Sequence, residues 1–110
     1  MTLDELSVLH NIRREIERDR RRLEELEQSG GTKAQRGAVR AIIETKTKKL
    51  WEERARLESW IAGIPDSMVR QIFTRRFVDG KSWVQVAVEI GGDNTADTVR
   101  MIAKRYARRM

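Results

Sequence analysis

The chain has 110 residues, of which 36% are charged and only 5% aromatic, a composition that favours one helical domain, or a small domain with a helical extension, over a sheet sandwich. It contains no cysteine, which excludes disulfides and thiolate metal sites, and it lacks an apolar run long enough to cross a bilayer, so we expect a soluble, cytoplasmic protein that does not bind membranes. The formal net charge of +6 favours a polyanionic partner.

The first predicted element is one long helix from Leu3 to about Gln28. Thr2 can cap its amino end, and the acids that follow suit the positive end of a helix dipole. Apolar residues then recur at a spacing of three and four, as on a helix that packs along a partner helix. This seam comprises Leu9, Ile12, Ile16, Leu23 and Leu26, and Asp19 takes its one polar position.

A second long helix is predicted from about Lys33 to Ala62, after a break at Ser29 to Thr32. The glycines of the break end the first helix, and Thr32 can cap the second. Two helices of similar length joined by a short loop fold back on each other as an antiparallel hairpin. The seam of the second helix comprises Val39, Ile43, Leu50, Leu57 and Ile61, and it is interrupted by Lys46 and Arg54.

Trp51 and Trp60 lie beside the seam of this hairpin rather than on it. A large indole is rarely left in water. One hypothesis is that a tryptophan packs against a second copy of the hairpin, which predicts a homodimer. The other is that the tryptophans fasten the hairpin to the helix that begins near Pro65, and the pattern leaves both open.

The basic run from Arg18 to Arg22 also has two interpretations. It can contact phosphates as a second nucleic-acid patch. More often such a run is a solvated helix face, and here acids surround it at the three- and four-residue spacing of surface ion pairs.

The segment from Ala62 to Pro65 is the one clear domain boundary. Gly63 can end the preceding helix, and Pro65 prevents its continuation while favouring a new helix start. The next helix is predicted from about Asp66 to Val78, with an apolar face of Val69, Ile72, Phe73 and Phe77. The chain therefore divides into residues 1–63, a helical hairpin, and residues 64–110, a second domain.

Residues 82–106 are predicted to form two short helices with a glycine-containing corner between them. Ser82 can cap the first helix, and Gly91 and Gly92 end it, because glycine adopts a left-handed conformation at low cost. The apolar stripes are Trp83, Val86, Ala87 and Ile90 on the first helix and Val99, Ile102, Ala103 and Tyr106 on the second. With a basic opposite face on the second helix, this is the layout of a helix-turn-helix. The predicted fold is all-α, a long N-terminal antiparallel helical hairpin followed by a three-helix helix-turn-helix domain.

The segment from Ile64 to Arg109 resembles region 4 of bacterial sigma factors and the similar domain of small phage-encoded transcriptional regulators. The matching residues are Ile64-Pro65, Arg76 to Gly80, Ser82-Trp83, Val86-Ala87, Ile90-Gly91 and Asp97 to Arg100. The corner, Gly92 to Ala96, is longer than in the common motif, so base-contact positions do not transfer one for one. Its Gly-Gly-Asp-Asn-Thr sequence is more similar to the phage proteins than to housekeeping sigma factors.

The resemblance implies that the helix starting near Asn94 or Thr95 lies in the major groove of double-stranded DNA, and the amino-terminal turns of such a helix contact base edges. The positive charge concentrates there, because residues 65–110 hold nine basic residues against five acidic ones. The candidate base contacts are Asn94, Thr95, Asp97, Thr98, Arg100 and Met101. The candidate phosphate contacts are Arg75, Arg76, Lys81, Lys104, Arg105, Arg108 and Arg109.

Catalysis has little support in this sequence, and we expect no enzyme activity and no cofactor. His10 is the only histidine, and no motif accompanies it that would define a nucleophile or a metal site. Gly91-Gly92 lacks the glycine spacing of a phosphate-binding loop.

The predicted function is a DNA-binding transcriptional regulator of phage or prophage type. The resemblance further implies a contact with host RNA polymerase, with the hairpin as dimerisation or polymerase-contact arm. One alternative is a phage DNA-packaging adaptor similar to a small terminase subunit, which also joins a helix-turn-helix to helices. The other is a coiled-coil assembly protein that does not bind DNA.

Overall fold

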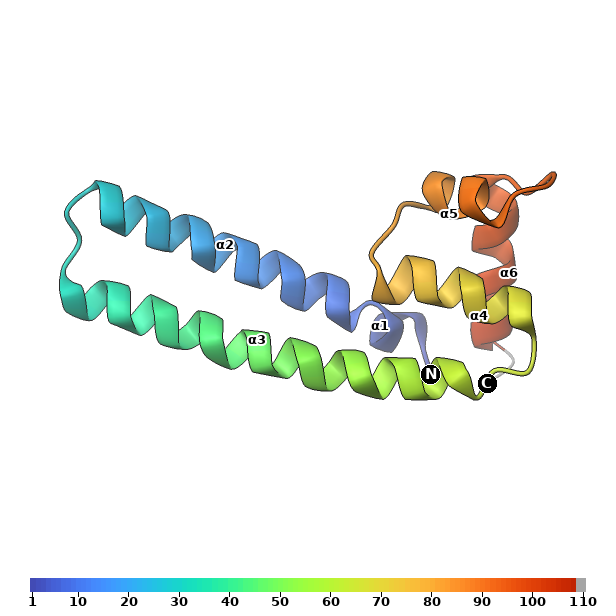
Figure 1. The fold of residues 1–110 in the computed structure, drawn as a ribbon, viewed down its shortest axis with the longest axis horizontal. Coiled ribbons are helices and arrows are strands. Elements are labelled where there is room, and N and C mark those ends of the chain that lie inside the picture. The colour runs from blue at the N-terminus through green and yellow to red at the C-terminus, as the bar shows by residue number, and fades with distance from the viewer. Residues whose placement is uncertain (109–110) are drawn as a thin grey trace.

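The computed structural model describes residues 1–108, which form helices and connecting turns (Figure 1). None of the helices in this range combines the length and the apolarity that a bilayer crossing requires. In chain order the elements are α1 (Leu3–Leu6), α2 (Val8–Gln28), α3 (Lys33–Ala62), α4 (Ser67–Phe73), the π-helical turn η1 (Thr74–Val78), α5 (Trp83–Ile90) and α6 (Ala96–Arg108).

Helices α2 and α3 lie side by side and antiparallel (Figure 1). The predicted caps are in place, because Thr32 accepts a hydrogen bond from the Gln35 amide and the Gln35 side chain accepts one from the Thr32 amide. This reciprocal arrangement satisfies two amides that a helix start otherwise leaves unpaired. The seam is buried at Ile12, Ile16, Leu26, Leu57 and Ile61 and only half-buried at Leu23, Val39, Ile43 and Leu50.

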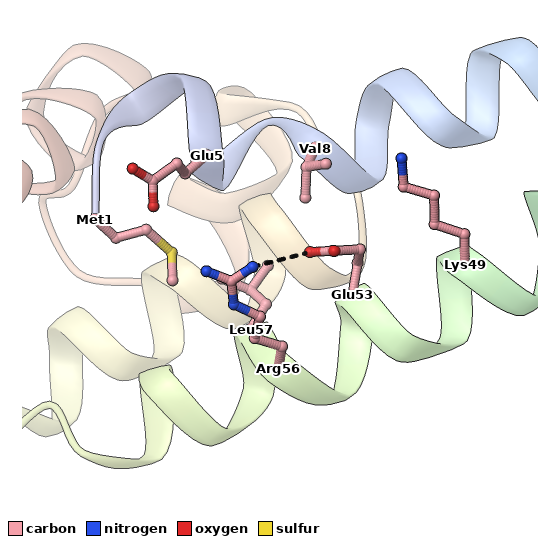
Figure 2. Close-up of a pocket in the computed structure, with 7 residues that line it drawn as sticks. All are labelled: Met1, Glu5, Val8, Lys49, Glu53, Arg56 and Leu57. Atoms are coloured by element: carbon pink, nitrogen blue, oxygen red, sulfur yellow. Dashed lines mark ion pairs between the residues drawn. The ribbon is translucent and has the colours of Figure 1, made fainter.

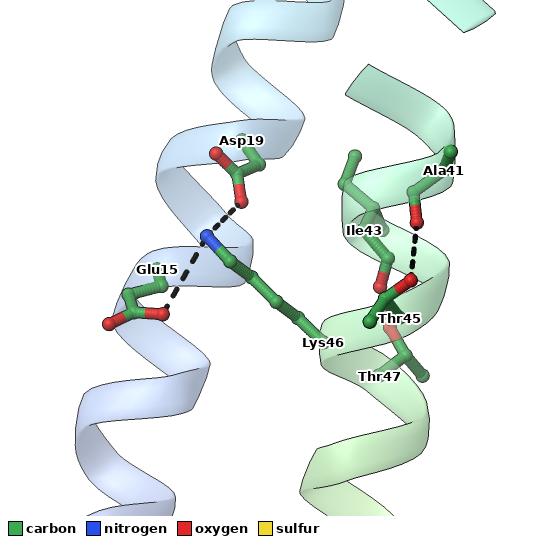
Figure 3. A network of polar contacts seen from close by, with 7 residues as sticks. All are labelled: Glu15, Asp19, Ala41, Ile43, Thr45, Lys46 and Thr47. Atoms are coloured by element: carbon green, nitrogen blue, oxygen red, sulfur yellow. Dashed lines mark hydrogen bonds and ion pairs between the residues drawn. The ribbon is translucent and has the colours of Figure 1, made fainter. Parts of the chain in front are cut away.

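Two of the three polar interruptions of the seam, Asp19 and Lys46, meet each other (Figure 3). The Lys46 ammonium lies 2.7 Å from the Asp19 carboxylate and 3.6 Å from Glu15. Its hydrogen bond to Asp19, reinforced by the charges of both acids, raises the pKa of Lys46 above the ordinary lysine value. A sliding of the helices by one turn would separate this pair, so it helps to fix the register of the hairpin.

The first predicted helix is interrupted at Ser7, which corrects the single helix expected from Leu3 to Gln28. Ser7 has φ −86° and ψ 1°, and its hydroxyl donates to the Leu3 carbonyl at 2.9 Å. Such a hydroxyl competes with the amide for the same carbonyl and bends the helix. Leu6 and Leu9, on either side of the bend, are both buried in the core.

The predicted helix over residues 66–78 begins as expected but ends in the wider turn η1. The Asp66 carboxylate caps α4 by accepting from the amides of Met68 and Val69. In η1 the Asp79 amide donates to the Thr74 carbonyl, five residues back, at 2.9 Å. The consecutive residues Phe77 and Val78 of this turn are both buried.

One continuous core joins the base of the hairpin to the C-terminal helices, although the chain turns sharply at residues 63–65. Phe73 lies at its centre, stacked on Trp60 at 5.8 Å between ring centroids and meeting Phe77 and Tyr106 edge to face. The fastening role of Trp60 is therefore confirmed, whereas Trp51 is 60% exposed. The core residues come from every helix: Leu6, Leu9, Leu57, Ile61, Ile64, Val69, Ile72, Phe73, Phe77, Val78, Val86, Ala87, Val99 and Ala103.

A hydrogen bond between residues far apart in the sequence reinforces this junction. The Arg13 guanidinium on α2 donates to the Val78 carbonyl at the end of η1, at 2.6 Å. Gly80 follows with φ +73°, and a Cβ at this position would lie 3.3 Å from the same guanidinium. The turn that leads to α5 is thus held against the hairpin, with little room for a side chain at residue 80.

Candidate nucleic-acid interface

The corner between α5 and α6 is built as the sequence predicted. Ser82 caps α5 by accepting from the Gln85 amide at 3.1 Å. Gly91 and Gly92 have φ values of +81° and +66°, a region that disfavours other residues. Thr95 then caps α6 by accepting from the Thr98 amide at 3.2 Å, so the helix starts at Ala96, close to the expected start.

Helix α6 has a buried side and a fully solvated side. Val99 and Ala103 are completely buried against α4 and α5, and Ile102 and Tyr106 pack at the edge of the core. The opposite side, called here the outer face, follows from the helical period of 3.6 residues. It consists of Asp97, Arg100, Met101, Lys104 and Arg108, all exposed.

The outer face carries three basic side chains and one acid. Arg100 is 3.1 Å from Asp97, in a surface ion pair that solvent screens and that contributes little to stability. Within residues 1–108, neither Lys104 nor Arg108 pairs with a carboxylate. The outer face therefore presents cations to solvent, available to phosphates and base edges.

The remaining candidate base contacts hold the start of α6 together. The Asn94 amide group donates to the Gly91 carbonyl at 2.9 Å, and the hydroxyls of Thr95 and Thr98 share a hydrogen bond of 2.9 Å. The Asn94 amide keeps a second N–H and its carbonyl oxygen, the two groups that a bidentate contact with adenine uses. Thr98 lies on a flank of α6, beside the outer face rather than within it.

The candidate phosphate contacts on η1 and the turn after it have intramolecular partners. Arg76 stacks over the Trp83 ring at 4.8 Å and donates to the Lys81 carbonyl, and the Lys81 ammonium pairs with Glu89. Arg75 is half-buried in a groove shared with α3, and its Nε is buried without a hydrogen-bond partner among residues 1–108. The structure does not bring these three side chains together with the outer face.

The two remaining candidate phosphate contacts are Arg105 and Arg109. Arg105 is exposed, but it lies on the flank of α6 next to α4, in a groove of about 430 Å³ that Asp66 and Tyr106 also line. Arg109 lies outside the described residues.

The pocket at the base of the hairpin differs from the outer face in its charge. This pocket of about 180 Å³ is lined by Glu5, Lys49, Glu53 and Arg56 together with apolar residues, and Arg56 pairs with Glu53 across it (Figure 2). Its two acids balance its two bases, so it has no preference for an anion. Within residues 1–108 no three metal-ligating side chains lie together.

Helix α6 lies at the end of the molecule opposite the α2–α3 loop, so the hairpin leads away from it (Figure 1). The Arg18 to Arg22 run lies along α2, on that arm, rather than beside α6. Comparisons of the chain with protein-family models, with curated proteins and with solved structures find no match.

Proposed function

We propose that the protein binds double-stranded DNA through the outer face of α6 and acts as a transcriptional regulator of phage or prophage type. In this account α6 lies in the major groove, which is wide enough to admit an α-helix. The contact with host RNA polymerase that the sigma-like pattern implies stays a prediction for this chain.

The main support for this proposal is the row of three cations on the solvated side of α6. The buried side of α6 is fixed on the core by Val99 and Ala103, while Arg100, Lys104 and Arg108 project from the other side. Apart from the weak Arg100–Asp97 pair, they have no salt-bridge partner among residues 1–108. A helix that served only to complete a three-helix core would not need three cations along one solvated stripe. A polyanion lying along that stripe would satisfy all of them at once.

The direction of the hairpin agrees with such a complex. The hairpin extends from the shared core away from α6 (Figure 1). A duplex bound at the outer face would then leave most of α2 and α3 free in solvent. The arm is then available for a protein partner, and the basic run from Arg18 to Arg22 is a solvated face in this account.

Replacing Arg100 by alanine tests which residue reads the sequence. We expect affinity for the preferred site to fall by about 1–3 kcal/mol, with relaxed preference at one base pair, because arginine donates to both acceptors of guanine. Fluorescence anisotropy with the site and its single-base variants measures both effects. Arg18→Ala, which removes an exposed cation from the arm, is the matched control and should bind as the wild type does. Unchanged binding by Arg100→Ala would mean that α6 does not read bases.

We also propose that the hairpin joins two copies of the chain. Trp51 stands 60% exposed on α3. It lies one turn after Thr47, which lines a groove of about 390 Å³ with Ile16, Leu50, Arg13, Glu17 and Arg20. The Arg54 guanidinium lies 5.4 Å from the indole. An exposed indole and a groove on one face are what a self-complementary interface needs, because each copy supplies both parts.

Sedimentation velocity of the full chain at tens of micromolar tests the dimer. We expect wild type to sediment as a dimer and Trp51→Ala to raise the dissociation constant about 30-fold, the effect of losing an interface residue that contributes about 2 kcal/mol. Ile42→Ala is the control, because Ile42 is also an exposed apolar residue of α3 (46%) but lies on the other flank. A monomeric wild type would refute the dimer, and a ring of many subunits would favour the packaging adaptor.

A further inference from the structure

Met101 is the one uncharged residue of the outer face. It lies one turn after Asp97 and one turn before Lys104, and 49% of it is exposed. Single apolar side chains are common on protein surfaces, but Met101 is the one such side chain on the outer face, between charged neighbours that would contact DNA.

The fold of the described residues does not account for Met101. The apolar residues of α6 that enter the core or pack at its edge are Val99, Ile102, Ala103, Tyr106 and Ala107. Met101 projects from the opposite side of the helix, so its removal would leave no cavity. Its role therefore has to be sought in what the outer face binds.

The chemistry of the major groove narrows what an apolar side chain can contact there. Base edges in this groove present hydrogen-bond donors and acceptors, with one apolar group, the C5-methyl of thymine. The methionine side chain is flexible and polarisable, so it can follow a methyl group without fixed geometry. On the same face, Arg100 can donate hydrogen bonds to the two major-groove acceptors of guanine.

We propose that Met101 is a specificity-determining residue that recognises thymine by packing its side chain on the C5-methyl group. This inference rests on the proposed function, since it requires α6 to lie in the major groove. It adds a chemical identity for one position of the DNA site, which the charge of the outer face alone does not give.

Deoxyuridine substitution tests the contact, because deoxyuridine keeps every hydrogen-bonding group of thymidine and lacks only the methyl. A duplex that the wild type selects from a random pool is prepared with each thymine in turn replaced by deoxyuridine, and binding is titrated by anisotropy. At one thymine we expect wild-type affinity to fall about fourfold, the change that corresponds to about 0.8 kcal/mol for one methyl group. Met101→Ala should bind the two duplexes equally.

Two further variants separate this contact from general weakening. Met101→Leu, of similar volume and polarity, should keep most of the discrimination. Lys104→Ala should bind both duplexes more weakly and keep the full ratio between them. Circular dichroism of each variant checks that α6 is intact.

Equal binding of thymine and deoxyuridine duplexes by the wild type at every position would overturn the inference and leave the proposed function standing, because the selected site is still bound. Discrimination that persists in Met101→Ala would also overturn it. A wild type that selects and binds no duplex would overturn both proposals.

Discussion

Replacing Phe73 by alanine is expected to lower the free energy of unfolding by about 3–5 kcal/mol, the usual cost of removing a buried aromatic ring. The ring is fully buried and contacts aromatic side chains from three other elements: Trp60, Phe77 and Tyr106. Its loss leaves a cavity where the hairpin meets the C-terminal helices. Urea denaturation followed by circular dichroism measures the change.

The same experiment tests whether the chain unfolds as one unit. Because one core spans the junction, ellipticity and tryptophan fluorescence should report a single transition with the same midpoint as each other. We expect this agreement between the two probes in the wild type and also in Phe73→Ala. Val88→Ala is the control, since Val88 is 75% exposed, and should change stability by less than about 0.5 kcal/mol. A variant in which the hairpin keeps the wild-type midpoint while the C-terminal helices melt early would contradict a shared core.

Reversing the charge of Lys104 and Arg108 to glutamate is expected to weaken DNA binding at least about 100-fold. Two charged hydrogen bonds to phosphates, each contributing about 1.5 kcal/mol, give about 3 kcal/mol, and repulsion adds to the loss. The slope of the logarithm of affinity against the logarithm of salt concentration should fall by about two, one unit for each lost phosphate contact. Anisotropy titrations over a range of salt concentrations measure both quantities.

The matched control reverses two lysines of the arm. Lys33→Glu with Lys48→Glu changes the net charge by the same amount at exposed positions of α3, far from α6 along the hairpin. We expect this variant to lose only the small part of affinity that depends on total charge. Equal losses in both variants would show that the outer face has no special role in binding.

The helices and most of their ends could be predicted from the sequence, because local chemistry determines them. Thr2, Thr32, Asp66 and Ser82 cap helices where their side chains reach free amides. The seam of the hairpin follows from apolar spacing in the same way. Each of these signals lies within a few residues of the structure that it specifies.

The structure differs from the prediction where contacts between residues distant in the sequence decide the conformation. The spacing of residues 66–78 does not indicate the π-helical turn, and the Arg13–Val78 hydrogen bond joins residues 65 positions apart. Nor could spacing decide between the two hypotheses for the tryptophans. The position of Phe73 gives Trp60 its partner and leaves Trp51 exposed.

The same holds for the candidate site, where local spacing predicted the positions of some residues and contacts between distant residues decided the others. The outer face of α6 was predictable because helical periodicity assigns residues of one helix to one side, so Arg100, Met101 and Lys104 were expected together. Arg75, Arg76 and Lys81 were grouped with them by charge alone. Charge in a sequence does not say which way a side chain points, and Arg76 instead stacks on Trp83 while Lys81 pairs with Glu89.

The most direct test of DNA recognition by α6 is selection of duplexes from a random pool by the full-length wild type at about 100 mM salt, close to physiological ionic strength. We predict enrichment of a short motif that binds at least about a thousandfold more tightly than unrelated DNA, the lower range for specific complexes. A two-fold symmetric motif would in addition report the dimer. A pool that stays random after repeated rounds, together with no detectable binding at about 50 mM salt, where phosphate contacts are strongest, would contradict the account.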